Sequence, residues 1–192
     1  MFEDRNDDAL IERKQTSELI YDGVVVHLYR DGIALPDGKP SVREVIRHVG
    51  AACVVPLTEN NEVICVRQYR YPVGRVLLEI PAGKLNGKDE DPVEAALREL
   101  REETGASCEK LTSLGPLYPT PAYTDECIHM YLAEGLSCGD IAPDEDEFLD
   151  VVRVPIAELV DMILAGEIAD SKTQAAVLKV WLMKCRAEGK PC

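Results

Sequence analysis

The chain has 192 residues, of which 46% are hydrophobic and 29% charged, and its net charge is −14. This composition is typical of one globular domain with a modest appendage, and the negative charge argues against nucleic acid or an anionic membrane as a partner. No apolar run approaches the roughly 20 residues that span a bilayer. The charged N-terminus also lacks the apolar core of a signal peptide, so we expect a cytoplasmic protein.

Two turn signals, at residues 31–32 and 36–39, separate predicted strands at residues 18–29 and 41–48. A segment this short cannot bury a core of its own. We therefore expect a small N-terminal antiparallel sheet over residues 1–45, ahead of a main domain over residues 46–192.

The main domain alternates strand and helix patterns. Asn60-Asn61 predicts a hairpin between two apolar strands, and Pro155 is expected at the first position of a helix. A final helix carries core spacing at Ala175, Leu178, Trp181 and Leu182. The expected strands cover residues 51–57, 63–69, 76–80, 111–117, 127–132 and 148–154, and the final helix covers residues 171–186. This order predicts an α/β fold, a mixed sheet with helices on both faces.

Seven cysteines occur, an odd number, and none has the C-x-x-C spacing. Cys53, Cys65 and Cys127 fall inside apolar strand patterns. We interpret them as reduced core residues, and we expect neither a disulfide framework nor a zinc site.

A tight loop from Gly83 leads into a predicted helix. Asp91 is a suitable N-cap, Pro92 suits the first helical position, Glu94 completes a capping box, and Gly105 ends the helix. The predicted apolar face consists of Val93, Ala96, Leu97 and Leu100.

The acidic residues of this helix break local rules. Glu99, Glu102 and Glu103 lie three and four apart near the C-terminal end, where the helix dipole disfavours negative charge. Each like-charge pair costs about 0.2–0.5 kcal/mol. A bound divalent cation would compensate, because Mg²⁺ prefers carboxylate oxygens and substrate phosphates. The alternative is a solvated acidic face.

Residues 98–106, Arg-Glu-Leu-Arg-Glu-Glu-Thr-Gly-Ala, together with Glu90, resemble the Nudix box of the Nudix hydrolases. Six residues separate Gly83 from Glu90 where the usual pattern has five, and a loop absorbs such an insertion cheaply. The resemblance covers roughly residues 45–187. It implies the Nudix α/β/α sandwich and an enzyme that hydrolyses a nucleoside diphosphate linked to another group.

Features outside the box resemble the ADP-ribose pyrophosphatases. They are the lead-in at residues 78–84, Pro121 sixteen residues after Gly105, and the strand at residues 67–72 that carries Arg70. Arg43 matches a second substrate-contacting arginine of that subfamily. The resemblance also implies a homodimer formed by the N-terminal sheet. Each feature has a plainer reading, for example a turn proline or a solvent-exposed arginine.

The resemblance assigns roles residue by residue. Glu99, Glu103 and the Ala82 carbonyl would bind Mg²⁺, with Mn²⁺ as a possible substitute, and Glu102 would bind the metal or a bridging water. Arg98 would orient the carboxylates. Glu147, or else Glu145, would bind metal or accept the proton of the attacking water. The implied substrate-binding residues are Arg43, Arg70, Lys84, Thr120 and Pro121.

The implied reaction is metal-dependent hydrolysis of ADP-ribose to AMP and ribose 5-phosphate. The alternatives are another nucleoside diphosphate sugar, such as a UDP- or GDP-hexose, and a non-catalytic domain that senses a nucleotide sugar. All box carboxylates are present and no basic recognition segment follows residue 187, which favours an enzyme.

Overall fold

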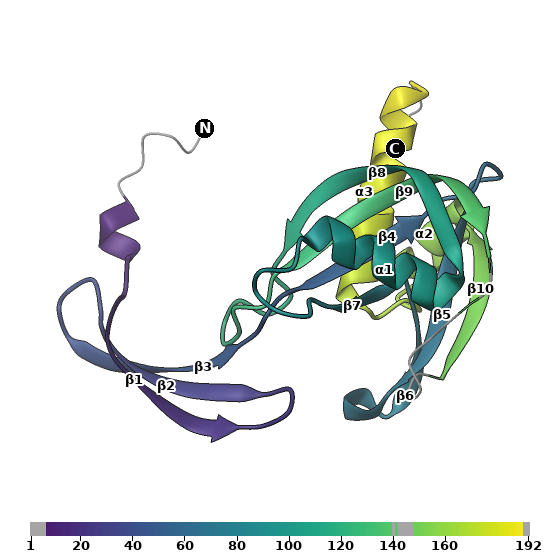
Figure 1. Cartoon of the computed structure of the whole chain (residues 1–192). Helices are drawn as coiled ribbons and strands as arrows, with labels where there is room; N and C mark the ends of the chain where they lie inside the picture. Colours follow the sequence, from purple (N-terminus) through teal and green to yellow (C-terminus); the bar gives the residue numbers. More distant parts are fainter. Residues whose placement is uncertain (1–6, 140, 142–147, 190–192) are drawn as a thin grey trace. The chain divides into compact units, whose positions relative to one another are not determined.

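The computed structural model describes residues 7–139, 141 and 148–189 (Figure 1). Its chain divides into two compact units. One holds the residues up to His48 together with Thr120–Glu126, and the other holds Val49–Pro119 and the residues from Cys127 onward. The predicted domain boundary between residues 45 and 46 remains a prediction. No helix in the described ranges is long and apolar enough to cross a membrane.

The N-terminal unit contains a three-stranded antiparallel sheet in the order β1-β2-β3. Its elements are η1 (Asp7–Leu10), β1 (Arg13–Asp22), β2 (His27–Ala34) and β3 (Pro40–Arg47). The continuous strand predicted over residues 18–29 is wrong, because the chain reverses between Gly23 and Val26. The turn predicted at residues 31–32 is also wrong, since Asp31 and Gly32 continue β2.

The C-terminal unit contains two sheets and three α-helices. One sheet has the order β7-β4-β9-β8, in which β4 and β9 are parallel and the other pairs antiparallel; the other sheet is antiparallel, in the order β10-β5-β6. The elements are β4 (Ala51–Pro56), β5 (Glu62–Arg70), η2 (Tyr71–Val73), β6 (Arg75–Glu79), β7 (Ala82–Lys84), α1 (Pro92–Thr104), β8 (Ala106–Leu117), β9 (Ile128–Cys138), β10 (Leu149–Pro155), α2 (Ile156–Leu164) and α3 (Ser171–Ala187).

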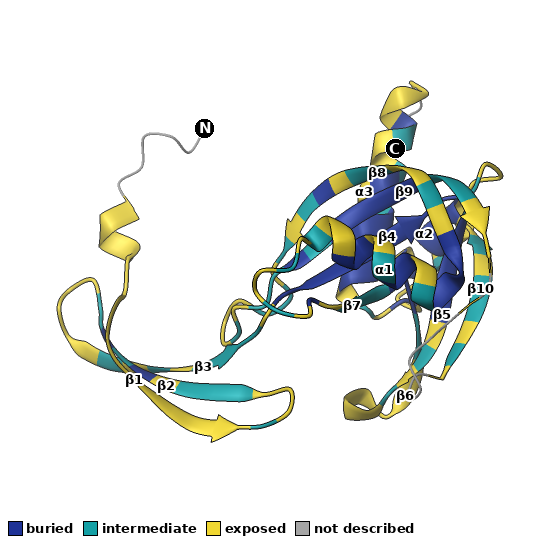
Figure 2. Ribbon diagram, viewed as in Figure 1, coloured by how far each residue is buried: buried dark blue, intermediate teal, exposed yellow. Residues whose placement is uncertain are grey.

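Strand β4 lies between two hydrophobic cores. All six of its residues are buried, which is expected of a strand covered on both faces (Figure 2). Cys53 and Val55 face a core shared with α2 and α3, whereas Ala52 and Val54 face a core shared with α1. The predicted α/β/α sandwich with a mixed sheet and an N-terminal antiparallel sheet is therefore confirmed.

Two local predictions about this unit are wrong. The Asn60-Asn61 turn does not join a hairpin, because β4 and β5 belong to different sheets and share only the isolated bridge between Leu57 and Val63. Pro155 ends β10 and precedes α2 as its N-cap, one position before the helix. Turn signals are local, whereas sheet membership is decided by packing.

The predicted helix faces are shifted in the structure. In α1, Val93 and Leu97 are each 40% exposed, and the buried residues include Ala95 and Ala96. In α3, Leu182 is exposed, while Ala176, Val177 and Val180 form the buried stripe. Ala175, Leu178 and Trp181 pack only partly against that core.

Candidate active site

Helix α1 turns two of its carboxylates toward the protein interior. It begins after Asp91, whose side chain accepts a hydrogen bond from the Val93 N–H at 2.9 Å, and it ends at Gly105 with a left-handed φ of 68°. Between these caps, Glu99 is 7% exposed and Glu103 is 2% exposed. The alternative of a solvated acidic face is therefore wrong for these two residues.

Arg98 forms ion pairs with three glutamates of this region. Its Nη1 lies 2.5 Å from Glu99 Oε1 and 3.3 Å from Glu102 Oε2, and its Nε lies 3.4 Å from Glu90 Oε1. Its Nη2 donates to the Lys84 carbonyl at 3.1 Å. Burial lowers the pKa of Arg98, but the attraction of Glu99 and Glu90 outweighs burial and raises it. The orienting role of Arg98 remains a prediction.

The two buried carboxylates lie against the backbone of β7. The Ala82 N–H donates to Glu103 Oε2 at 3.3 Å. A Cβ added to Gly83 would overlap the carboxylate of Glu99. Only glycine at position 83 therefore lets Glu99 approach β7 so closely. The neighbouring residue, Ala82, is the one that contacts Glu103.

These groups suit a hard divalent cation by their chemistry. Glu99, Glu103 and the backbone of Ala82 supply oxygen donors, which are the ligands that Mg²⁺ prefers. Within the described ranges, no three acidic, histidine or cysteine side chains converge as a preformed metal cluster. The predicted residues Glu145 and Glu147 lie outside the described residues.

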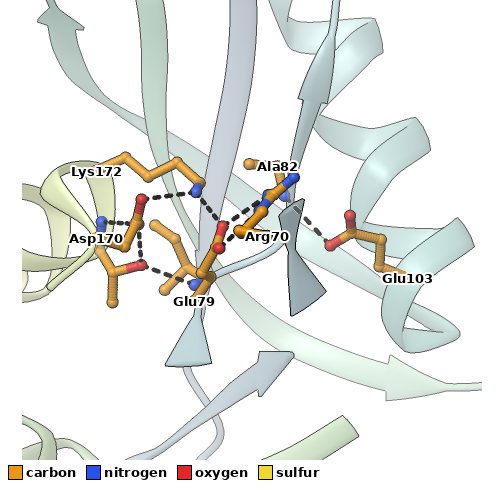
Figure 3. Close-up of polar contacts among 8 residues, drawn as sticks. Arg70, Glu79, Ala82, Glu103, Asp170 and Lys172 are labelled. Carbon is orange, nitrogen blue, oxygen red and sulfur yellow. Dashed lines mark hydrogen bonds and ion pairs between the residues drawn. The ribbon is translucent and has the colours of Figure 1, made fainter. Parts of the chain in front are cut away.

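Arg70 lies at the end of β5 in a partly buried ionic network (Figure 3). Its Nε and Nη2 donate to the two carboxylate oxygens of Glu79 at 2.8 and 2.7 Å. Lys172 at the start of α3 also binds Glu79, and its Nζ lies 3.0 Å from Asp170. We term Arg70, Glu79, Lys172 and Asp170 the ionic network.

Glu79 is the buried centre of the ionic network, with 1% of its side chain exposed. Burial alone would raise its pKa, but Arg70 and Lys172 outweigh burial and lower it. Sequence reasoning missed both Glu79 and Lys172 as site residues. The only local signal was an acid in the otherwise apolar run at residues 76–80, since Lys172 lies far away in the sequence.

Other predicted substrate-binding residues belong to the N-terminal unit. Arg43 and Pro121 line one pocket of about 340 Å³, in which Glu12 pairs with the guanidinium of Arg43. Thr120 begins the turn that carries Pro121, and its carbonyl accepts from Thr124 N at 3.3 Å. The structure thus brings Arg43 and Pro121 together, as two residues of one pocket.

The segment that carries Pro121 is fastened to β3 by polar contacts. The Ile46 N–H donates to the Tyr123 carbonyl at 2.7 Å. Arg47 bridges Asp125 at 3.2 Å and the buried carboxylate of Asp31 at 2.8 Å. In the C-terminal unit, Lys84 ends β7 with an exposed side chain, and only its carbonyl contacts Arg98.

Comparison with known proteins places the chain in a family of known fold. A family model described as the NUDIX domain matches residues 46–176. The chain is 41% identical over 171 residues to a Bacillus subtilis (strain 168) protein named ADP-ribose pyrophosphatase, covering 88% of this chain and 92% of that one. It is 45% identical over 168 residues to a Bacillus methanolicus protein named methanol dehydrogenase activator, covering 86% and 90%. A crystal structure of an ADP compounds hydrolase shares the fold, with a TM-score of 0.81, 24% identity and coverage of 94% and 97%.

Gly83→Ala tests the close approach of Glu99 to β7. The new methyl group would push aside the carboxylate, which is the far end of a flexible side chain, so the fold should survive. We expect Mn²⁺ affinity, measured by electron paramagnetic resonance, to fall about tenfold or more, as is typical when the support of a metal ligand is disturbed. Gly87→Ala is the matched control, because nothing lies within 4 Å of the Cβ it would add. Unchanged Mn²⁺ affinity in folded Gly83→Ala would contradict the interpretation.

Proposed function

The chain belongs to the NUDIX domain family, and on that premise we propose that it hydrolyses the pyrophosphate bond of ADP-ribose to AMP and ribose 5-phosphate. It is a Nudix pyrophosphohydrolase that resembles ADP-ribose pyrophosphatases over most of its length. The observation that carries the proposal is the burial of Glu99 and Glu103 against the backbone of residues 82–83.

The metal proposed for this site is Mg²⁺. Glu99, Glu103 and the Ala82 carbonyl would hold it, with Glu102 as a further ligand or the holder of a bridging water. The bound ion supplies positive charge that stabilises the negative charge developing on the phosphate oxygens. Arg98 keeps the carboxylates oriented through its contacts with Glu99 and Glu102.

The remaining roles are assigned to residues outside helix α1. Arg70 binds a phosphate oxygen of the substrate, for which a planar guanidinium is well suited. Glu147, or else Glu145, accepts the proton of the attacking water. Arg43 and Pro121 contact the nucleotide sugar, an assignment supported by their shared pocket.

A second candidate function is regulatory. Similarity to the protein named methanol dehydrogenase activator favours a role in which the chain acts upon a dehydrogenase. The two functions differ in their requirement for a protein partner. Activation of a purified dehydrogenase by a variant that lacks hydrolysis would support the regulatory candidate over the catalytic one.

A panel of nucleoside diphosphate compounds assayed with Mg²⁺ tests the substrate. We expect ADP-ribose to be among the best substrates, ahead of UDP- and GDP-hexoses, and the release of AMP to stop when the metal is chelated. A preference for a hexose would reject the assignment to ADP-ribose and leave the pyrophosphohydrolase assignment intact.

Glu103→Gln tests the metal-binding role. The amide keeps the size of the side chain and can still accept from the Ala82 N–H, but it lacks the charge that a metal needs. We expect kcat to fall by about 100-fold or more, and the melting temperature without metal to stay unchanged or rise slightly. Glu94→Gln, in the exposed first turn of the same helix, should retain activity. Wild-type turnover in Glu103→Gln would rule out the role.

We also propose a homodimer formed through the N-terminal unit. All ten residues of β1 are exposed, including Leu19, Ile20 and Tyr21, and so small a sheet needs a packing partner. Light scattering at micromolar concentration should give twice the mass of the chain. A monomer with full activity would reject this proposal.

A further inference from the structure

The ionic network brings two cations to one buried carboxylate. Both oxygens of Glu79 accept from Arg70, and Lys172 makes a further contact with one of them. The side chain of Lys172 is itself only 10% exposed. Burying an ammonium group is costly, so a lysine here needs a reason beyond filling space.

Packing does not supply that reason. The Ile80 N–H already donates to Thr173 Oγ1 at 3.0 Å, a contact that joins the start of α3 to the residue after β6. Thr173 is in turn fixed by Asp170, whose carboxylate accepts from the Thr173 N–H at 2.9 Å and caps the helix. Helix α3 is therefore attached to this segment without the charge of Lys172.

The charges of the ionic network balance only when Lys172 is included. Its four members contribute two positive and two negative charges, and Asp170 also faces the positive end of the α3 dipole. Without Lys172, Arg70 would be the sole cation beside Glu79. Glu79 would then neutralise the guanidinium of Arg70, and the attraction of Arg70 for an anion would weaken.

The geometry of Arg70 leaves part of it available to a ligand. Glu79 engages Nε and Nη2, so the two N–H groups of Nη1 are not used by this pair. The side chain of Arg70 remains 39% exposed. The hydrogen bonds to Glu79 raise the pKa of Arg70 above its ordinary value, and the charge of Glu103 adds a smaller contribution in the same direction.

We propose that Lys172 is a positioning residue that supplies the counter-charge for Glu79, so that Glu79 fixes the orientation of Arg70 without cancelling its attraction for the substrate diphosphate. The inference rests on the proposed function, because it takes Arg70 as the group that binds the diphosphate. It adds a residue from α3 to that site.

The experiment compares four variants with the wild type. Lys172→Met removes the charge and keeps the length, and Lys172→Met combined with Glu79→Gln removes one positive and one negative charge together. Arg70→Met removes the binding group itself. Lys179→Met is the control, because this lysine lies on the same helix but contacts the Leu114 carbonyl instead.

Kinetics with ADP-ribose give the first readout. Lys172→Met should raise KM roughly three- to tenfold and change kcat less than about twofold, since it weakens a charge interaction without removing a catalytic group. The charge-balanced double variant should have a KM below that of Lys172→Met but above that of the wild type, because the amide offers Arg70 one acceptor oxygen instead of two. Lys179→Met should leave KM unchanged, and Arg70→Met should raise KM more than Lys172→Met does.

Calorimetric binding of magnesium pyrophosphate gives the second readout, and it does not depend on turnover. Lys172→Met should weaken this binding about three- to tenfold, as it raises KM, and the double variant should restore it in part. Equal binding by all the folded variants, or a double variant weaker than Lys172→Met, would overturn the proposal. If the wild type does not hydrolyse ADP-ribose but the binding pattern holds, the proposed substrate is wrong and the role of Lys172 stands.

Discussion

The five residues from Glu79 to Gly83 are held from both sides, and the site depends on this restraint. Helix α3 binds the segment through Lys172 and Thr173, whereas α1 binds it through Glu103 at the Ala82 N–H. Beneath it, β4 pairs with β7 and the Val54 N–H donates to the Pro81 carbonyl at 3.0 Å. The Ala82 carbonyl that we propose as a metal ligand would be useful only if its position were fixed, and these contacts restrain the backbone around it.

The same restraint explains why the carboxylates of α1 can be buried. An isolated buried carboxylate would change its protonation state rather than remain charged. Here Arg98 approaches Glu99, and the Ala82 N–H approaches Glu103, so each carboxylate has a hydrogen-bond donor. The helix accepts unfavourable charges near its C-terminal end because the strand and the arginine beside them compensate.

The sequence predicted what local signals determine and missed what distant segments decide. The limits of α1 follow from Asp91, Pro92 and Gly105, and the structure confirms them. The buried face of α1 was predicted from apolar spacing, which assigned Val93 and Leu97 to the core. That rule fails here because Glu99 and Glu103 occupy the inward positions. The pairing of Glu79 with Lys172 is not predictable from the sequence, because no local pattern links residues 93 positions apart.

A chain with a net charge of −14 can attract a diphosphate only through locally concentrated positive charge. A mobile arginine would supply charge but would lose side-chain freedom on binding, and holding it in place beforehand avoids that loss. A carboxylate can hold an arginine in place through two hydrogen bonds, but a single carboxylate also neutralises the positive charge of that arginine. Adding a second cation beside that carboxylate resolves the conflict, because the arginine is then held in place while the carboxylate shares its negative charge between two cations. The ionic network has this composition, with Lys172 on the side of Glu79 that α3 provides.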